Sequence, residues 1–418
     1  MLQTAFPALE TREARIFYAT QLFSLIGTFM QNTVLPLLAY RLTGQPLYLG
    51  LVGFASTLPV LLLTLPAGVI VERLNKRNLV IALQSVMMTH AFLMAAFTLY
   101  GTLSIWHIII LSLLLGLASA VEVVARQTWM VDLVGPAALS NGIALQSTIF
   151  NVARVLGPIL SVPLLLMLGT QQGALWVFIF NALSFLLVII ALFTMKTRFN
   201  TDELIMPSQL SWREQFAEGR AFIANNLLVF MLLLMVAIVG LFGTPSIQQI
   251  PAFAQDVLRQ EGDNESAVII RNSLLFLAQG FGTVLAGVTA SIMSSVRQKG
   301  GLLIIGQVVL SAALLGWAAS NSIGYALPIM MLIGWGTVMT LTLTNQMLQM
   351  KTPIALRGRV ISAYLWASQG LSPFGSLLIG WFAESRGVPF AITLAGCMCL
   401  VTLVGLHLFT PAVRQARE

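Results

Sequence analysis

The sequence predicts an all-α membrane protein in which twelve transmembrane helices form two pseudo-symmetric halves of six helices each. Hydrophobic residues make up 57% of the 418 residues and charged residues only 9%, whereas about 25% of a soluble domain is charged. Apolar segments long enough to cross a bilayer, roughly 20 residues each, recur along the chain. Short motifs before the middle of the chain also recur after it, which indicates an internal repeat.

The twelve apolar segments follow one another with mostly short connections. In the N-terminal half they are residues 14–40, 48–71, 78–99, 106–127, 142–168 and 173–195. In the C-terminal half they are residues 226–250, 266–293, 300–320, 325–350, 359–383 and 388–410. The residues before the first segment are polar and include Glu10 and Arg12, unlike a cleavable signal peptide, so we expect the first helix to remain in the membrane.

One long, charged connection divides the chain into three parts. Residues 1–195 are the predicted N-terminal half, residues 196–222 a cytoplasmic linker, and residues 223–418 the C-terminal half. Three pairs of motifs relate the halves at offsets of 217, 215 and 219 residues: Pro136 to Leu139 with Pro353 to Leu356, Gly157-Pro158 with Ser372-Pro373, and Ala67-Gly68-Val69 with Ala286-Gly287-Val288. Two halves of the same topology predict a solute site near mid-membrane at their interface.

Basic residues near the segment ends predict the orientation, because they accumulate on the cytoplasmic side of the membrane. One side has only Arg41, Arg259, Arg271 and Arg386, and Arg154 lies within a segment. The remaining Lys and Arg residues, of 22 in all, lie on the side of the termini and the linker. We therefore expect a multi-pass protein of the bacterial cytoplasmic (inner) membrane with both termini in the cytoplasm. Because the basic residues are spread along the chain, the net charge of +7 does not indicate nucleic acid as a partner.

No sequence pattern indicates an enzyme, a cofactor or a metal centre. Cys397 and Cys399 are the two cysteines, and their spacing of two points them to different faces of a helix, so we expect neither a disulfide framework nor a metal site. No nucleophile–base pair can be assembled. The phosphate-binding pattern Gly-x-x-x-x-Gly-Lys-Ser/Thr is absent from the sequence, which argues against ATP as the energy source.

The connection between the second and third segments carries a recognisable signature. Residues 68–77 resemble the loop motif Gly-x-x-x-Asp-Arg-x-Gly-Arg-Arg of the major facilitator superfamily, with Glu72 in place of Asp and Asn75 in place of Gly. Residues 125–134 and 141–158 are similar to the branch that contains macrolide-efflux and enterobactin-exporter proteins, and residues 357–362 resemble its loop 10–11. The resemblance spans nearly the whole chain and implies the major facilitator fold.

The resemblance also implies a gate at the cytoplasmic helix ends. A glycine lets helices approach closely, and nearby charges can pair across the helix ends; in the family such contacts stabilise the outward-facing state. The alternative is that these bases serve only as topology signals. The predicted gating residues are Gly68, Glu72, Arg73, Lys76, Arg77, Asp132, Arg357 and Arg359.

Polar side chains inside the first and tenth segments predict a solute cavity, because a polar group within the bilayer must face protein or water. In each segment polar residues recur at three- or four-residue spacing, which is one helix face, and an asparagine stands beside the last of them. The resemblance agrees, since the first, fourth, seventh and tenth helices border the cavity in the family. The alternative is hydrogen bonding between packed helices. The predicted cavity residues are Gln21, Ser24, Thr28, Gln31 and Asn32, and Thr340, Thr344 and Asn345.

Three charged residues are predicted to meet inside the membrane. Glu122 lies well inside the fourth segment, and Arg126 follows one turn later on the same face. Glu122 and Arg154 are each 16 residues from the chain reversal near residue 138, so antiparallel helices bring them to a similar depth. The resulting Glu122–Arg126–Arg154 cluster is either a static brace between helices or a site for coupling or for an anionic substrate.

Together these features predict that the protein is a secondary active transporter that exports a small amphipathic organic compound by alternating access. Export and proton antiport are implied by the resemblance. One alternative is a dedicated siderophore exporter, whose anionic, oxygen-rich substrate suits Arg126 and Arg154. Another, from a different class, is a non-transporting membrane receptor or scaffold. The expected partners are the small-molecule substrate, protons and the lipid bilayer, and the protein is expected to act as a monomer without a cofactor.

Overall fold

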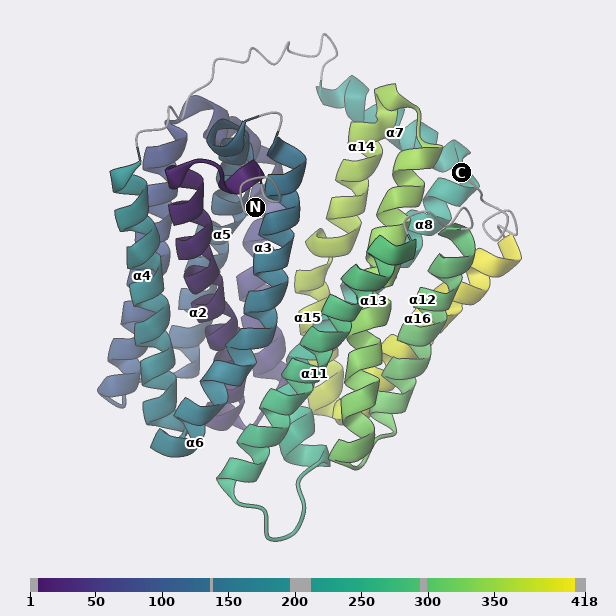
Figure 1. The fold of residues 1–418 in the computed structure, drawn as a ribbon. Coiled ribbons are helices and arrows are strands. Elements are labelled where there is room, and N and C mark those ends of the chain that lie inside the picture. Colours follow the sequence, from purple (N-terminus) through teal and green to yellow (C-terminus); the bar gives the residue numbers. More distant parts are fainter. Residues whose placement is uncertain (1–6, 136–137, 196–211, 294–298, 410–418) are drawn as a thin grey trace. The chain divides into compact units, whose positions relative to one another are not determined.

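The computed structural model describes residues 7–135, 138–195, 212–293 and 299–409, and this part of the chain is helical without a β-strand (Figure 1). The chain divides into two compact units. The first consists of Met1–Gly44, Ala55–Glu203 and Asp263–Ser273, and the second of Gln45–Phe54, Leu204–Gly262 and Leu274–Glu418. Most of the first unit therefore precedes the charged connection in the sequence, and most of the second follows it.

Five long helices make up the described residues before that connection. After a short 3-10 helix, η1 (Pro7–Leu9), they are α2 (Arg12–Thr43), α3 (Pro46–Arg73), α4 (Lys76–Leu99), α5 (Ile105–Val134) and α6 (Leu139–Thr194). α6 contains the fifth and sixth predicted segments. Gly169 interrupts its helical backbone with a φ of 79°, a conformation that glycine adopts without a Cβ clash. The predicted connection between the two segments is thus a turn at this glycine.

The described residues after the connection begin with α7 (Trp212–Asn225), while residues 196–211 of the predicted linker lie outside the described part. α8 (Leu227–Ile238) continues to Val257 through short irregular turns, where Pro245 and Pro251 lack the backbone donor of a regular helix. The turns are η3 (Val239–Gly243), α9 (Thr244–Ser246), η4 (Ile247–Gln249), α10 (Ile250–Ala252) and η5 (Phe253–Val257). The later elements are α11 (Glu265–Ile292), α12 (Lys299–Ala318), α13 (Ile323–Lys351), α14 (Ile354–Leu365), η7 (Trp366–Gly370), α15 (Ser372–Arg386) and α16 (Val388–Phe409).

The predicted membrane helices correspond to these elements. Within the described residues, ten helical stretches are long and apolar enough to cross a membrane. One of them, Asn141–Thr194, contains two predicted segments separated by Gly169. The eleventh predicted segment corresponds to α14, η7 and α15, which a π-turn interrupts. The prediction of an all-α membrane protein is confirmed, and the described helices correspond to the predicted segments.

Capping residues explain where several helices begin and end. The hydroxyl of Thr11 accepts a hydrogen bond of 3.1 Å from the backbone N–H of Ala14 at the start of α2. Gly44 ends α2 with a φ of 64°. The side-chain oxygen of Asn75 accepts from the N–H of Asn78 over 3.2 Å. Asn75, which stands where the loop motif has glycine, therefore has a local role in starting α4.

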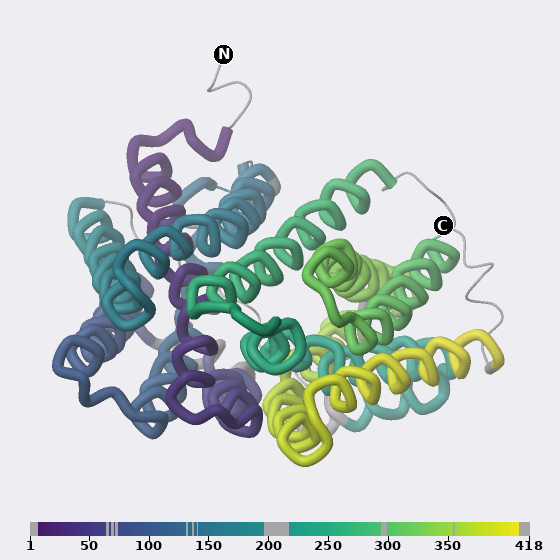
Figure 2. The backbone as a smooth tube through the Cα atoms, turned by 90° about the horizontal axis from the view of Figure 1, so that it is seen from below, coloured from purple at the N-terminus to yellow at the C-terminus, as the bar shows by residue number. Residues whose placement is uncertain are grey.

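Glycines allow close helix contacts inside each unit. In the first unit α2 packs along α6 (Figures 1 and 2), and a Cβ added to Gly157 would lie 2.5 Å from the Cβ of Phe29. In the second unit α12 packs along α13, and a Cβ added to Gly336 would lie 2.9 Å from the backbone nitrogen of Leu310. A larger residue at either position would push the two helices apart.

The first turns of two helices belong to a different unit from the rest of the helix. α3 begins at Pro46, and Gln45–Phe54 group with the second unit; α11 begins at Glu265, and Asp263–Ser273 group with the first. The two helix starts, at positions 46 and 265, are 219 residues apart. This is the offset of one of the motif pairs, so the exchange of helix starts follows the internal repeat.

Candidate functional site

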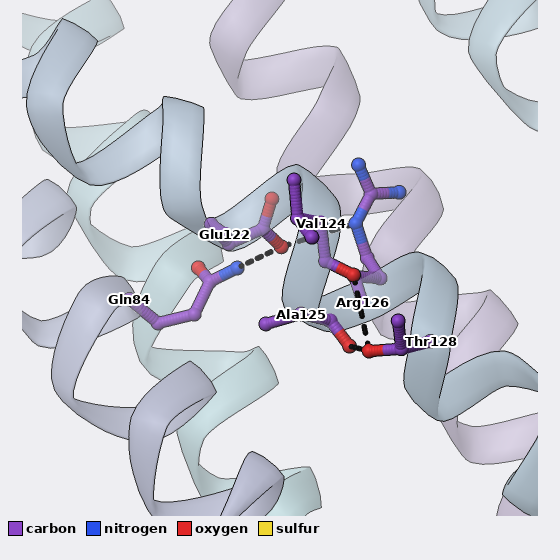
Figure 3. Close-up of polar contacts among 6 residues, drawn as sticks. All are labelled: Gln84, Glu122, Val124, Ala125, Arg126 and Thr128. Carbon is purple, nitrogen blue, oxygen red and sulfur yellow. Dashed lines mark hydrogen bonds and ion pairs between the residues drawn. The ribbon is translucent and has the colours of Figure 1, made fainter. Parts of the chain in front are cut away.

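A buried ion pair lies on α5 in the first unit. The Nε of Arg126 is 3.1 Å from the Oε1 of Glu122, and the two side chains are 13% and 6% exposed. The Nε–H is not aligned with an acceptor, so the contact is an ion pair rather than a hydrogen bond. From α4, the amide nitrogen of Gln84 donates to the same Glu122 oxygen over 3.2 Å (Figure 3). The predicted pairing of Glu122 with Arg126 is confirmed, and Gln84 extends it to a neighbouring helix.

Arg154 lies on aromatic rings instead of joining this ion pair. Its Cζ is 4.9 Å from the ring centre of Phe150, one turn earlier on α6, and 5.7 Å from that of Phe29 on α2. Both distances are typical of cation–π contacts. Among the described residues no carboxylate pairs with Arg154, so the prediction of a three-residue cluster is wrong. Equal distance from the chain reversal fixes the height of a side chain, but the rotation of α6 about its axis decides which neighbour it meets.

The polar face predicted on the first helix divides into buried and exposed residues. Gln31 is 1% exposed, and its side-chain oxygen accepts a hydrogen bond of 2.8 Å from the amide of Asn181 on α6. Gln21 and Ser24 are also buried, whereas Asn32 is exposed. The hydroxyl of half-buried Thr28 donates to the carbonyl of Ser24 over 2.9 Å. The spacing thus identified one face of α2, and part of that face packs against α6.

The corresponding residues of α13 are mostly buried as well. Thr340 and Thr344 are fully buried, and in the described part of the chain their hydroxyl oxygens have no hydrogen-bond partner. A Cβ added to Gly306 of α12 would lie 3.5 Å from the Oγ1 of Thr340, so this hydroxyl faces α12. Half-buried Asn345 accepts a hydrogen bond from Gln349, one turn later. Neither threonine is open to solvent in this conformation.

The gating residues are only partly described. The structure does not describe the surroundings of Gly68 or the side chains of Glu72, Arg73 and Asp132. Lys76 and Arg77 form the start of α4, and Nη2 of Arg77 donates to the carbonyl of Phe193 near the end of α6 over 2.8 Å. Arg77 therefore joins two helix ends within the first unit.

The second predicted gating region has a partner on the short helix α7. Arg357 is exposed, whereas Arg359 pairs with Glu218. A Cβ added to the neighbouring Gly219 would lie 3.2 Å from the Cβ of Arg359, so α7 lies close against α14. The sequence placed Glu218 among the charges of the connection, and only the helical fold of α7 brings it to Arg359.

A polar cluster that the sequence did not predict holds the exchanged start of α11. Glu265 pairs with Arg41, near the end of α2, and accepts a hydrogen bond of 2.6 Å from the hydroxyl of Thr170 on α6. In the same exchanged segment, Arg271 pairs with Asp263. Arg41 and Glu265 are 224 residues apart, so only the tertiary structure reveals their pairing.

Metal-ligating groups do not gather in the described part of the chain. No group of three or more His, Cys, Asp or Glu side chains there is arranged to hold a metal ion. Cys397 and Cys399 are both free thiols. Chemically distinctive groups inside the described helices include the Glu122 ion pair, Arg154 on its two rings, buried His90, and the buried amides and hydroxyls.

Comparison with known proteins extends over the whole chain. Residues 3–417 match a family model described as transmembrane secretion effector. The multidrug efflux pump Tap of Mycolicibacterium fortuitum is 22% identical over 401 residues, which are 93% of each chain. A staphyloferrin A transporter of Staphylococcus aureus is 28% identical over 145 residues, so the alignment spans 34% of this chain and 36% of that transporter.

Several solved transporters share the fold at low sequence identity. A bacterial homologue of the human lysosomal transporter Spinster aligns over 98% of this chain and 99% of its own, with a TM-score of 0.73 and 14% identity. The nucleoside transporter NupG aligns over 96% and 100%, with a TM-score of 0.71 and 12% identity. The family model covers nearly the whole sequence, and the chain therefore belongs to the transmembrane secretion effector family of the major facilitator superfamily of membrane transporters.

Proposed function

We propose that this protein is a secondary active transporter that exports a small amphipathic organic compound from the cytoplasm by alternating access, in exchange for protons. The observation that carries the proposal is the match to a multidrug efflux pump over 93% of both chains. The internal repeat and the charged residues held inside the helices support it, since intramembrane charges mark transport pathways. The absence of an ATP-binding pattern from the sequence favours an ion gradient as the energy source.

Transport into proteoliposomes tests this proposal. The purified protein is reconstituted without ATP, an acid-inside pH gradient is imposed, and uptake of three fluorescent probes is followed: cationic ethidium, anionic 2-naphthoate and neutral 2-naphthamide. We expect accumulation of at least one probe above protein-free liposomes, and loss of that accumulation when nigericin collapses the gradient. Accumulation that survives nigericin would contradict proton coupling, and no accumulation of any probe would contradict the proposed efflux.

A dedicated siderophore exporter is the second candidate, favoured by the 145-residue match to a staphyloferrin A transporter. The two candidates differ in the compound that leaves the cell. Untargeted metabolomics of medium and cytoplasm, with and without the gene, is expected to show an iron-chelating compound retained in the cytoplasm of the deletion strain under iron limitation. If the deletion instead changes only the retention of added drugs, the multidrug assignment is the better one.

The orientation and assembly belong to the same proposal. The distribution of basic residues supports termini and a connecting segment in the cytoplasm, and the single-chain twofold repeat supports a monomer as the working unit. Alkaline phosphatase is expected to be inactive when fused within residues 196–222 and active when fused within residues 258–264. Light scattering of the detergent-solubilised protein is expected to give one chain per particle.

A further inference from the structure

Arg154 lies at the middle of a membrane helix. It is fifteen residues from Leu139, where α6 begins, and fifteen from Gly169, where the helical backbone is interrupted. At 1.5 Å per residue, each interval measures about 22 Å. The hydrocarbon core of a bilayer is about 30 Å thick, so a core spanned by this helix includes residue 154. A charge at this depth is costly and normally has a specific partner.

The described residues provide no anionic partner for this charge. Glu122, the acid expected at the same depth, is bound by Arg126 and Gln84. The rings of Phe29 and Phe150, which lie beside the Arg154 Cζ, carry no oxygen or nitrogen, so the N–H donors of the guanidinium have no hydrogen-bond acceptor among the described residues. Arg154 is only half-buried. Its side-chain nitrogens are not among the fully buried polar atoms of the described residues that have no hydrogen-bond partner. The guanidinium nitrogens therefore keep some exposed surface.

We propose that Arg154 binds the carboxylate of the transported compound and that Phe150 and Phe29 contact its apolar body. This inference rests on the proposed function and narrows it to amphipathic organic anions. The planar fork of a guanidinium matches the two oxygens of a carboxylate in a bidentate contact. Phe150 is 38% exposed, so part of its surface is open to an apolar group beside the charge. Arg126, by contrast, already has a carboxylate partner in Glu122.

Binding to the purified protein in nanodiscs of phosphatidylcholine tests the site without competition from anionic lipid. The probes are 2-naphthoate and its neutral amide, 2-naphthamide, measured by calorimetry against empty nanodiscs. We expect the naphthoate to bind about tenfold or more tightly than the amide, as a charge-assisted contact predicts. Arg154→Gln should remove this preference. Arg154→Lys should keep part of it, because charge remains while the bidentate fork is lost. Phe150→Leu should weaken both probes alike.

Arg259→Gln is the matched control, because it removes one exposed positive charge outside the helices and should leave the preference unchanged. Equal binding of the two probes to the unsubstituted protein, or an intact preference in Arg154→Gln, would overturn the inference. If Arg154→Gln does not fold, a preference that Arg154→Lys retains in full would also count against it. Transport of ethidium without any preference for naphthoate would leave the proposed efflux standing and refute only the anion site. No transport of any probe would refute the efflux itself.

Discussion

Neutralising Glu122 tests whether its ion pair is a static brace. Glu122→Gln preserves the size of the side chain, and the new amide still accepts a hydrogen bond from Gln84. Arg126, however, stays 13% exposed without its counter-charge. Breaking a buried pair by removing one partner typically costs about 3–5 kcal/mol in soluble proteins, which corresponds to roughly a 100- to 4,000-fold change in the unfolding equilibrium at 1.4 kcal/mol per tenfold. Reversible unfolding in mixed micelles of dodecyl maltoside and dodecyl sulfate measures this loss.

Second substitutions identify the partner. Adding Arg126→Gln to Glu122→Gln should recover part of the lost stability, because the unpaired charge is removed. Adding Arg154→Gln should recover none, since Arg154 contacts Phe29 and Phe150 rather than Glu122. Glu218→Gln is the matched control: it breaks a pair whose acid is 52% exposed, and it should cost at most about 1 kcal/mol.

Two results would refute this reasoning. Recovery by Arg154→Gln but not by Arg126→Gln would show that the side chains pair differently in the membrane. A Glu122→Gln protein of unchanged stability that loses uphill transport driven by the pH gradient, yet retains downhill exchange, would make Glu122 the proton-coupling residue. The brace and the coupling site are thereby distinguished in one set of variants.

Three further predictions concern other regions of the chain. Arg73→Ala should impair transport at normal membrane insertion if the loop motif is a gate, and normal transport at matched protein level would make the motif a topology signal only. In a background without the two native cysteines, a cysteine at Asn32 should react with a water-soluble thiol reagent and one at Gln31 should not, because only Asn32 is exposed; equal reactivity would contradict the packing of α2 on α6. Glu265→Gln should change stability by less than about 1 kcal/mol, because its pair with Arg41 is 53% and 33% exposed; a loss as large as that of Glu122→Gln would show this pair to be buried in the membrane.

The helices were predictable because the lipid bilayer that surrounds them requires long apolar segments. A span must be long and apolar, and such segments stand out in a sequence with few charges, so the predicted bounds mostly differ from the observed ones by a few residues. The break between the fifth and sixth segments was also predictable, since Gly169 follows an apolar run and precedes polar Gln171 and Gln172. Helix spacing likewise predicted the contact of Glu122 with Arg126, because both lie on one helix.

Contacts between helices were predicted less well. The spacing of residues in the sequence predicts the depth of a residue and the face of the helix on which it lies, but not how that helix is rotated against its neighbour. Arg154 was expected beside Glu122 and lies on Phe150 and Phe29 instead. Gln31 was expected in a cavity and pairs with Asn181. An amide within an apolar segment signals a polar contact, but only the packed structure identifies the partner.

The exchanged starts of α3 and α11 are held by contacts of different kinds. Each is one continuous helix whose first turns group with a different unit from the rest of the helix. At the start of α3 the backbone of Gly50 lies directly against the backbone of Ser376 on α15. A Cβ added to Gly50 would lie 2.4 Å from the carbonyl oxygen of Ser376. The start of α11 is held by the pair of Arg41 with Glu265, which dissolved ions screen, and by the hydrogen bond from Thr170 to Glu265. Raising the ionic strength is therefore expected to weaken the Arg41–Glu265 pair and to leave the contact of Gly50 with Ser376 unchanged.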